Sequence, residues 1–489
     1  MEVKDKDTVV IKLIQVNDVY EIAPLKGGKV GGMARVGHIS DSIKKAFPNS
    51  YLVMGGDFLN PSLLGTLKID GKRIKGKQMI EVMNAMDFDI ATFGNHEFDL
   101  KLNELQDRLN ESEFQWTSAN VFQKNGEDIR VFNTIKNGDS IPIPEKVIYD
   151  IPIGKEYPLR LGFFSVTLDS NPVDWVYYSD YMLEARSAYT ALEQSRADII
   201  IGLTHLSIDQ DKVIAESLPG VALIMGGHEH KNMLVSTSGA TIAKADANAK
   251  TVYVHTLRYN TKTEQLKIDS ELLAINDKVS SLSSIKEIVD RWEKVLDAEI
   301  KQVIANPYEI IYETQVPLVV TDAANRSTQS DLGIIITEAM AKGFDIPAEA
   351  AIVNGGSFRL DDTLEGEITS IDIFRVLPFG GIVLKVEMMG ALLKEVLDYG
   401  ESQKGTGAFL QRYNIENKNG VWLINGVNIN EDQSYTIAVS DFLLKGYDIP
   451  FLTPQNKGVI NVYNPKAFEP AYDIRKTVID FMKRSYTLD

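Results

Sequence analysis

The 489-residue sequence predicts a layered α/β fold that is divided between two domains. In the first half, short apolar runs rich in β-branched residues alternate with amphipathic stretches, as in GKQMIEVMNAMDFDIATFG, where a helix-period segment leads into a strand-like one. This alternation is typical of layered α/β proteins. Because a single hydrophobic core stops growing at about 250 to 300 residues, a chain of this length is expected to form two domains.

An amphipathic segment separates the two predicted domains. The stretch SIKEIVDRWEKVLDAEIKQV has apolar residues at helical spacing with charged residues between them. We therefore predict a first domain over residues 1–282, a connecting helix over 283–304 and a second domain over 305–489. Within the second domain, RSTQSDLGIIITEAMAKGF predicts a helix, and AAIVNGGSFR begins a second strand-rich α/β region.

Composition excludes several classes of partner and site. Asp and Glu number 68 against 51 Lys and Arg, and the net charge of -17 argues against a nucleic-acid polymer or an anionic membrane surface as the main partner. The sequence has no cysteine, so any bound metal must use nitrogen and oxygen ligands. No signal peptide, lipid-attachment signal or 18-residue apolar run is apparent, so no membrane anchor is expected.

Five apolar runs in the first domain each end in side chains that bind metals. In an α/β sheet, the loops beyond the carboxyl ends of the strands gather at one edge, so these residues are expected to converge. A single such residue is most often a cap or a turn residue, but five runs with the same ending favour a metal site. The mixed nitrogen and oxygen donors suit Mn, Zn, Fe, Co or Mg, and their number favours two ions. The residues are Asp18, Asp57, Asn95, His205, His228 and His230.

The order of these motifs is specific. ND, GGD, GNHEFD, THLS and GGHEH resemble the calcineurin-like metallophosphoesterases, and the second half resembles the C-terminal domain of the 5'-nucleotidase family. The matching motifs of the second half are RSTQSDLG, VNGGSFR, VLPFGG, GTGAFLQ and DFLLKGYD. The resemblance spans nearly the whole chain. It implies an N-terminal four-layer αββα domain, joined by a helix to a smaller α/β substrate-binding domain.

The resemblance also implies a role for each predicted ligand of two divalent metal ions. Asp18 and His230 would bind the first ion, and Asp57 would bridge both. The second ion would be held by Asn95, His205 and His228.

Tyr20 departs from the family pattern at the first metal motif. Relatives commonly have DxH, whereas this chain has Asp18, Val19 and Tyr20. Two positions beyond Asp18 in an extended loop, the tyrosine would point to the same side as the carboxylate. It is therefore a candidate ligand through its phenolate. Alternatively, the first ion is one ligand short, or Tyr20 only packs.

His96 and Asp99 match the catalytic pair of the family. An imidazolium held by the Asp99 carboxylate would stabilise charge on the phosphoryl oxygens and on the departing alkoxide. The alternative is that His96 begins a helix and Asp99 is its capping partner.

The second domain matches the family's substrate-binding residues. The resemblance implies that Phe409 and Phe442 stack on the two faces of a nucleobase and that Asp448 accepts a ribose hydroxyl. Without it, both phenylalanines would be assigned to the core. The NGGSFR motif would let the backbone approach the ligand closely and offer a guanidinium, through Asn354, Gly356 and Arg359. Gly381 and the GYD sequence depart from the usual pattern, which leaves substrate preference open.

These observations predict metal-dependent hydrolysis of nucleoside 5'-monophosphates to nucleoside and phosphate. One alternative is the same scaffold acting on 2',3'-cyclic nucleotides, nucleotide sugars or a thiosulfate-type ester. Another is a nucleotide-binding protein without turnover, if Tyr20 disrupts the metal pair. The expected partner is a small-molecule nucleotide, and the protein is expected to be a monomer or a homodimer. The family resemblance favours a periplasmic or extracellular location.

Overall fold

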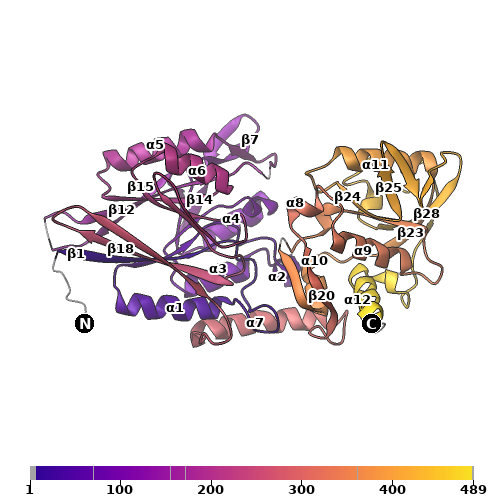
Figure 1. The fold of residues 1–489 in the computed structure, drawn as a ribbon, viewed down its shortest axis with the longest axis horizontal. Coiled ribbons are helices and arrows are strands. Elements are labelled where there is room, and N and C mark those ends of the chain that lie inside the picture. The colour runs from indigo at the N-terminus through magenta and orange to yellow at the C-terminus, as the bar shows by residue number, and fades with distance from the viewer. Residues whose placement is uncertain (1–6, 70, 155, 171, 361, 487–489) are drawn as a thin grey trace. The chain divides into compact units, whose positions relative to one another are not determined.

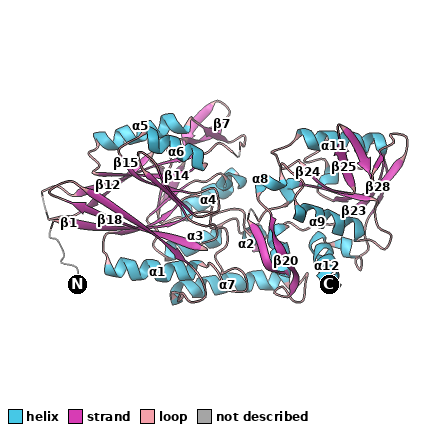
Figure 2. Ribbon diagram, viewed as in Figure 1, coloured by secondary structure: helices cyan, strands magenta, loops and turns pink. Residues whose placement is uncertain are grey.

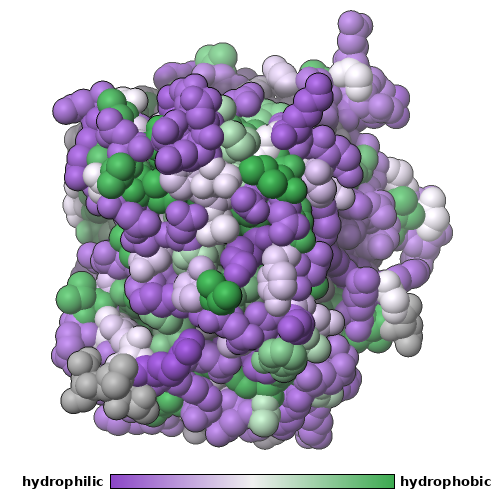
Figure 3. Space-filling view, turned by 90° about the vertical axis from the view of Figure 1, so that its right-hand side faces the viewer, coloured by the Kyte–Doolittle hydropathy of each residue, from purple (hydrophilic) through white to green (hydrophobic). Residues whose placement is uncertain are grey.

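The computed structural model describes residues 7–486 except 70, 155, 171 and 361, and it contains two compact units, Met1–Leu296 and Asp297–Asp489 (Figure 1). Helix α7 (Ser283–Ile300) occupies most of the segment predicted as the connecting helix, and most of it belongs to the first unit. None of the described helices is long and apolar enough to span a membrane. The face shown in Figure 3 is mostly hydrophilic, with scattered hydrophobic side chains.

The first unit is built on two six-stranded sheets. The first has the order β19 (Leu266–Ala274), β18 (Thr251–Asn260), β1 (Thr8–Val16), β2 (Ser50–Met54), β5 (Ile90–Thr92) and β6 (Gln115–Thr117). The second has the order β11 (Lys146–Ile151), β12 (Leu159–Thr167), β14 (Ile199–His205), β15 (Val221–Gly226), β17 (Thr241–Lys244) and β16 (Met233–Ser236). Each sheet has a parallel centre, β1-β2-β5-β6 in the first and β12-β14-β15-β17 in the second.

Helices cover the outer faces of this sheet pair (Figures 1 and 2). On one side lie α5 (Tyr181–Gln194) and α6 (Ile208–Ser217), and on the other lie α1 (Met33–Ala46) and α7. A buried apolar cluster between the sheets includes Leu13 and Val53 of one and Phe163 and Ile201 of the other. The chain therefore has the αββα layers and the layered α/β class predicted from its sequence.

Other short elements complete the first unit. The strands are β3 (Lys68–Ile69), β4 (Lys72–Arg73), β7 (Val121–Asn125), β8 (Asp128–Val131), β9 (Asn133–Lys136), β10 (Asp139–Pro142) and β13 (Val176–Tyr178). The helices are α2 (Leu63–Thr66), α3 (Lys77–Ala85), the 3-10 turn η1 (His96–Asp99) and α4 (Leu102–Glu111).

The second unit centres on a five-stranded mixed sheet. Its strand order is β24 (Leu410–Tyr413), β21 (Ala350–Asn354), β28 (Ser434–Ser440), β23 (Val383–Met389) and β29 (Val459–Tyr463). Two smaller sheets pair β20 (Ile310–Val319) with β22 (Thr363–Thr369), and β26 (Val421–Ile424) with β25 (Ile415–Lys418) and β27 (Val427–Asn428). The helices are α8 (Asp322–Asn325), α9 (Asp331–Lys342), η2 (Gly355–Ser357), α10 (Ser370–Val376), α11 (Gly390–Ser402), η3 (Leu443–Lys445), η4 (Pro470–Tyr472) and α12 (Ile474–Tyr486).

The parallel strands explain how one edge of the first unit collects polar residues. In the first sheet, Val16 pairs with Met54, and Met54 pairs with Ala91, so β1, β2 and β5 end at the same level. In the second sheet, Thr204 pairs with Gly226, so β14 and β15 also end together. Each of the five apolar runs singled out in the sequence is one of these strands.

Candidate metal centre and active site

Three of the predicted ligands form the tightest group at this edge. Asp18, Asp57 and His205 are buried, and each offers a ligand atom within 4.8 Å of the others. The Nε2 atom of His205 lies 3.1 Å from a carboxylate oxygen of Asp57 and 3.9 Å from one of Asp18. His230 joins the group, with its Nε2 atom 3.2 Å from Asp18.

The backbone at four predicted ligands is left-handed. The φ angles are 55° at Asp18, 56° at Asp57, 91° at His228 and 59° at His230. Such angles are uncommon for residues other than glycine, and they cluster at functional sites, where the surrounding structure has to hold them.

Gly94 and Gly227 allow the loops to approach closely. A Cβ atom on Gly94 would lie 2.1 Å from a carboxylate oxygen of Asp57, and one on Gly227 would lie 2.5 Å from the Gly55 carbonyl oxygen. Neither position accepts a side chain without displacing the loops, so Gly94 of the GN motif and Gly227 of the GGH motif have a steric role.

Burial, hydrogen bonds and nearby charges shift the pKa values of the buried predicted ligands. The Nδ1 atom of His205 lies 2.8 Å from the Gly55 carbonyl oxygen, to which its N–H can donate. The other ring nitrogen, Nε2, then points toward the carboxylates of Asp57 and Asp18. Burial lowers the pKa of His205, but Asp57 and Asp18 outweigh it and raise that pKa to about 9. For Asp18, burial favours a higher pKa, but His230 and His205 hold the pKa below its usual value. Burial, with His205 nearby, lowers the pKa of His228 to about 4.

Glu97 holds the loop that carries Asp57, and it was not singled out from the sequence. Its fully buried carboxylate accepts backbone N–H bonds from Asp57 at 2.9 Å, Phe58 at 2.8 Å, Leu59 at 3.0 Å and Gly94 at 2.6 Å. Burial, with the charge of Asp57, raises the pKa of Glu97 to about 7. In the sequence, the feature that could have identified Glu97 is its position inside the GNHEFD motif.

Asn95 and His96 lie at the start of η1. Both side chains are largely buried, and the backbone N–H of His96 donates to Asp57 at 2.7 Å. The His96 ring places Nδ1 2.9 Å from Oδ2 of Asp99, to which Asn60 also donates at 2.7 Å. No side chain caps the start of η1. The Asp99 carboxylate contacts the His96 imidazole and does not act as a cap.

Tyr20 is directed into the group of predicted ligands. It is 2% exposed, its hydroxyl lies 2.9 Å from Nε2 of His230, and it donates to Asp57 at 3.4 Å. These two polar contacts go beyond apolar packing. The whole set of carboxylate, imidazole, amide and phenol groups at this edge has the chemistry of a nitrogen and oxygen site for divalent ions.

In the second unit, the structure brings together part of the predicted substrate-binding set. Asn354 donates through Nδ2 to Asp448 at 2.7 Å, and Ser357 donates to the Asn354 side-chain oxygen at 2.7 Å. Burial raises the pKa of Asp448, an effect opposed by Asn354 and by the charge of Arg359. The guanidinium of Arg359 lies 5.7 Å from the centre of the half-exposed Phe379 ring.

The two glycine motifs of the second unit are joined through their backbones. The N–H of Gly355 donates to the Phe409 carbonyl oxygen at 2.7 Å, and the N–H of Gly356 donates to that of Gly407 at 2.9 Å. A Cβ atom on Gly356 would lie 3.1 Å from the Cα of Gly407, so the small residue permits this approach.

The two predicted stacking residues differ in exposure. Phe409 is 2% exposed, whereas Phe442 is 41% exposed. The ring of Phe442 packs on Tyr447, with ring centres 5.2 Å apart and planes at 37°. Tyr447 was noticed in the sequence only as a departure from the usual glycine, and its aromatic ring next to Phe442 is an additional candidate contact for a base.

Family profiles match both halves of the chain. The profile described as calcineurin-like phosphoesterase matches residues 11–232, and the profile described as 5'-nucleotidase, C-terminal domain, matches residues 310–453. The chain belongs to the 5'-nucleotidase family. The family predicted from the ordered motifs is thereby confirmed, and with it the assignment of the chain to the phosphoric monoester hydrolases.

Individual relatives agree with this assignment. The 5'-nucleotidase of Homo sapiens is 26% identical over 420 residues, which cover 78% of this chain and 69% of that protein. The trifunctional nucleotide phosphoesterase protein YfkN of Bacillus subtilis is also 26% identical, over 458 residues, but the match covers 83% of this chain and only 30% of YfkN. Among solved structures, a 5'-nucleotidase precursor from Thermus thermophilus superposes with a TM-score of 0.70 at 22% identity, covering 98% of this chain and 97% of that one, which shows the shared fold.

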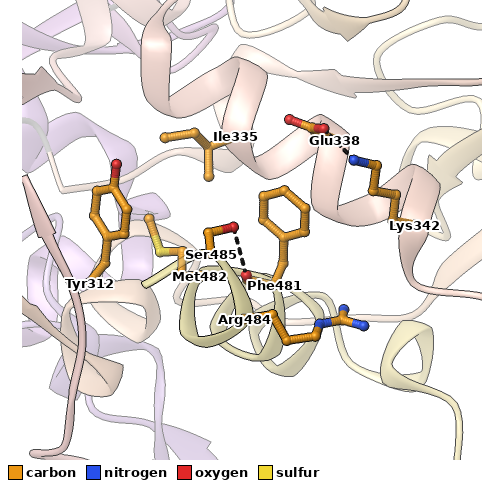
Figure 4. A pocket seen from close by; sticks show the side chains of 8 residues that line it. All are labelled: Tyr312, Ile335, Glu338, Lys342, Phe481, Met482, Arg484 and Ser485. Atoms are coloured by element: carbon orange, nitrogen blue, oxygen red, sulfur yellow. Dashed lines mark hydrogen bonds and ion pairs between the residues drawn. The ribbon is translucent and has the colours of Figure 1, made fainter. Parts of the chain in front are cut away.

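The second unit of this 5'-nucleotidase family member also contains a pocket of about 520 Å³ (Figure 4). It is formed by β20, α9 and α12, and Lys342 on its wall pairs with Glu338. None of the predicted metal, catalytic or substrate-binding residues lines it. Its residues are Tyr312, Ile335, Glu338, Lys342, Phe481, Met482, Arg484 and Ser485.

Proposed function

We propose that the protein hydrolyses nucleoside 5'-monophosphates to nucleoside and phosphate with two divalent metal ions. The observation that carries the proposal is the convergence of the predicted ligands at one sheet edge, next to the His96–Asp99 pair. Family membership supports a metal-dependent phosphoesterase, and the names of the relatives support a nucleotide substrate.

The residues at the edge fit a pair of ions. In this proposal, Asp18, Tyr20 and His230 would hold one ion, and Asn95, His205 and His228 would hold the other. Asp57, which lies 3.1 Å from His205 and accepts a hydrogen bond from Tyr20, would hold both. When bound, the ions would supply a Lewis acid for the phosphate and an activated water for in-line attack.

His96 supplies the acid side of the reaction in this proposal. Its Nδ1 atom is held by Asp99, which fixes the ring orientation and directs Nε2 away from that carboxylate. Nε2–H is then the group that donates to a phosphoryl oxygen and passes its proton to the departing alkoxide. Burial of both side chains limits competition from water, which strengthens this interaction.

The second unit would recognise the nucleoside. Asp448, held by Asn354, is the proposed acceptor for the ribose hydroxyls, and Arg359 would offer a guanidinium to the nucleotide. Phe409 and Phe442 remain the proposed base-stacking residues, with the exposed ring of Phe442 the more accessible of the two.

Substrate profiling tests this function. The protein is stripped with a chelator, reconstituted with Mn²⁺ and assayed for phosphate release. Nucleoside 5'-monophosphates should be the best substrates, ahead of 2',3'-cyclic nucleotides, nucleotide sugars and thiosulfate-type esters. Faster turnover of any of those compounds, or binding of nucleotides without turnover, would contradict the proposal.

A further inference from the structure

A buried lysine lies close to the sheet edge that carries Asp18, Asp57 and the predicted histidine ligands, which we call the metal edge. The proposed chemistry does not use this lysine. Lys244 ends β17 and is 1% exposed. Its ammonium group lies 2.7 Å from the carboxylate of Asp211 on α6 and forms an ion pair with Glu229. Because burying a charge is costly unless it is paired and hydrogen-bonded, such a cluster needs a structural reason.

The partners of Lys244 belong to both loops that carry the predicted histidine ligands. Its Nζ donates at 2.6 Å to the carbonyl oxygen of Leu206, the residue that follows His205. Glu229, its other partner, lies between His228 and His230. One ammonium group therefore ties the loop after β14 to the loop after β15.

Glu229 adds a second tie between the same two loops. Its other carboxylate oxygen accepts the backbone N–H of Ile208, the first residue of α6. The start of α6 is itself fixed by a capping box between Ser207 and Gln210. Glu229 thus connects the GGHEH loop to a rigid helix end that begins three residues after His205.

The surrounding residues make room for the cluster. A Cβ atom on Gly226 would lie 2.8 Å from Cε of Lys244 and 3.1 Å from the carboxylate of Asp211. Thr204 donates to the second oxygen of Asp211 at 2.6 Å. β15 and β17 pair at this level, with Gly226 opposite Lys244. The lysine stem therefore passes over a strand position that only glycine leaves open.

The loop that Glu229 anchors is one that needs support. His228 and His230 on either side of it have positive φ angles of 91° and 59°. A residue in this region keeps its conformation only when the surroundings hold it there. The side chain between the two histidines is the one that leaves the loop and reaches the lysine.

We propose that Lys244 and Glu229 are positioning residues, a clamp that sets the geometry of His205, His228 and His230 toward the metal ions. The inference rests on the proposed function, in which these histidines bind the ions. Supporting groups behind metal ligands typically change metal affinity by about 10- to 100-fold when they are removed.

Three variants at one loop provide the main test. Glu229→Ala cuts the clamp at its half-buried end, so the fold should persist while Mn²⁺ affinity, measured by isothermal titration, falls about 10- to 100-fold. Glu229→Gln keeps one acceptor oxygen, which can hold either Lys244 or Ile208 but not both, so its Mn²⁺ affinity should fall between that of Glu229→Ala and that of the wild type. Asp209→Ala, at an exposed carboxylate on α6 that pairs with Lys212, is the matched control and should bind Mn²⁺ like the wild type.

A second variant tests the lysine itself. Lys244→Met combined with Asp211→Asn removes the ammonium and one buried carboxylate together, which limits the charge left unpaired. It should weaken Mn²⁺ binding as Glu229→Ala does. Folded Glu229→Ala protein with wild-type Mn²⁺ affinity would overturn the clamp while leaving the function intact. Failure of the wild-type protein itself to bind Mn²⁺ would instead overturn the proposed function, and the clamp with it.

Discussion

The metal edge of the first unit and the predicted nucleoside set of the second unit are organised differently. At the metal edge, predicted ligands such as Asp18 and His205 are fully buried, and the buried carboxyl group of Glu97 holds the loops through backbone N–H groups. In the second unit, Asn354 and Asp448 hold each other, while Phe442 and Tyr447 are 41% and 69% exposed.

This difference matches two kinds of recognition. Stabilising charge on a phosphoryl group requires donors and ions fixed in advance, because reorganisation during the reaction is costly. Stacking on a base tolerates variation, since every base has a π-face. We therefore expect substitutions at the metal edge to affect kcat and metal binding, and substitutions at the aromatic residues to affect KM.

The largest effect is expected at His96. His96→Asn should lower kcat by about 100-fold or more, because it removes the positioned acid and charge stabiliser. Metal content, measured by elemental analysis, should stay unchanged. His38→Asn, in helix α1, is the control and should keep full activity. Loss of metal from the His96 variant would mean that this residue is a ligand and not a catalyst.

A stability effect should follow at Glu97. Glu97→Gln replaces a carboxylate that accepts four backbone N–H bonds by an amide with one acceptor oxygen. Since hydrogen bonds to charged groups contribute about 1.5–3 kcal/mol each, urea unfolding above the raised pKa of Glu97, at about pH 8, should show a loss of at least about 2 kcal/mol. Glu113→Gln, at an exposed position, should change the unfolding free energy by less than about 0.5 kcal/mol. Equal stability of the two variants would show that the loop carrying Asp57 keeps its conformation without the Glu97 carboxylate.

The exposed aromatic residues should act on substrate binding alone. Phe442→Ala should raise KM by about 5- to 150-fold, the equivalent of the 1–3 kcal/mol given by stacking on one base. The factor should be similar for purine and pyrimidine nucleotides, and kcat and metal content should not change. Phe409 is a poorer probe, because truncation of its buried ring also destabilises the fold. An effect on kcat, or on purines only, would contradict stacking by Phe442.

The smallest effect concerns His255, a fully buried residue of strand β18. Its ring contacts Ser270 at 2.8 Å and Gln15 at 3.0 Å, and burial lowers its pKa to about 3. The unfolded chain, with an ordinary pKa near 6.5, takes up a proton first as the pH falls. The stability that this group contributes is therefore complete above about pH 6.5 and is lost as the pH falls toward 3.

Urea unfolding of the wild type and of His255→Gln measures this contribution. Over one pH unit below 6.5, the wild type should lose up to about 1.4 kcal/mol more than the variant. Identical pH slopes for the two proteins would show that His255 is not held in its neutral form.

The features that could be predicted from the sequence are those that a local pattern determines. The runs that end at Asp18, Asp57 and His205 are parallel strands, so the rule for strand ends predicted their convergence. The sequence contains no comparable local pattern for contacts between segments that are far apart in the chain. Lys244 resembles an ordinary strand residue in the sequence, and only the pairing of β15 with β17 shows that its ammonium reaches two loops.

The same limit applies to Glu97 and to the aromatic residues. Glu97 stands in a recognisable motif, but its four N–H donors come from two loops whose approach depends on the packed sheets. Phe409 and Phe442 have similar apolar neighbours in sequence, yet one is buried and the other exposed. Burial of that kind is set by tertiary packing, which periodicity does not encode.

The number of metal ions bound per chain, measured together with turnover, is the decisive test of the proposed two-ion hydrolase. Protein reconstituted with Mn²⁺ is passed through a desalting column and divided between elemental analysis and an assay of phosphate release from a nucleoside 5'-monophosphate. We expect two ions per chain, with turnover that a chelator abolishes and Mn²⁺ restores. Full turnover with at most one bound ion, or turnover that survives complete removal of metal, would contradict it.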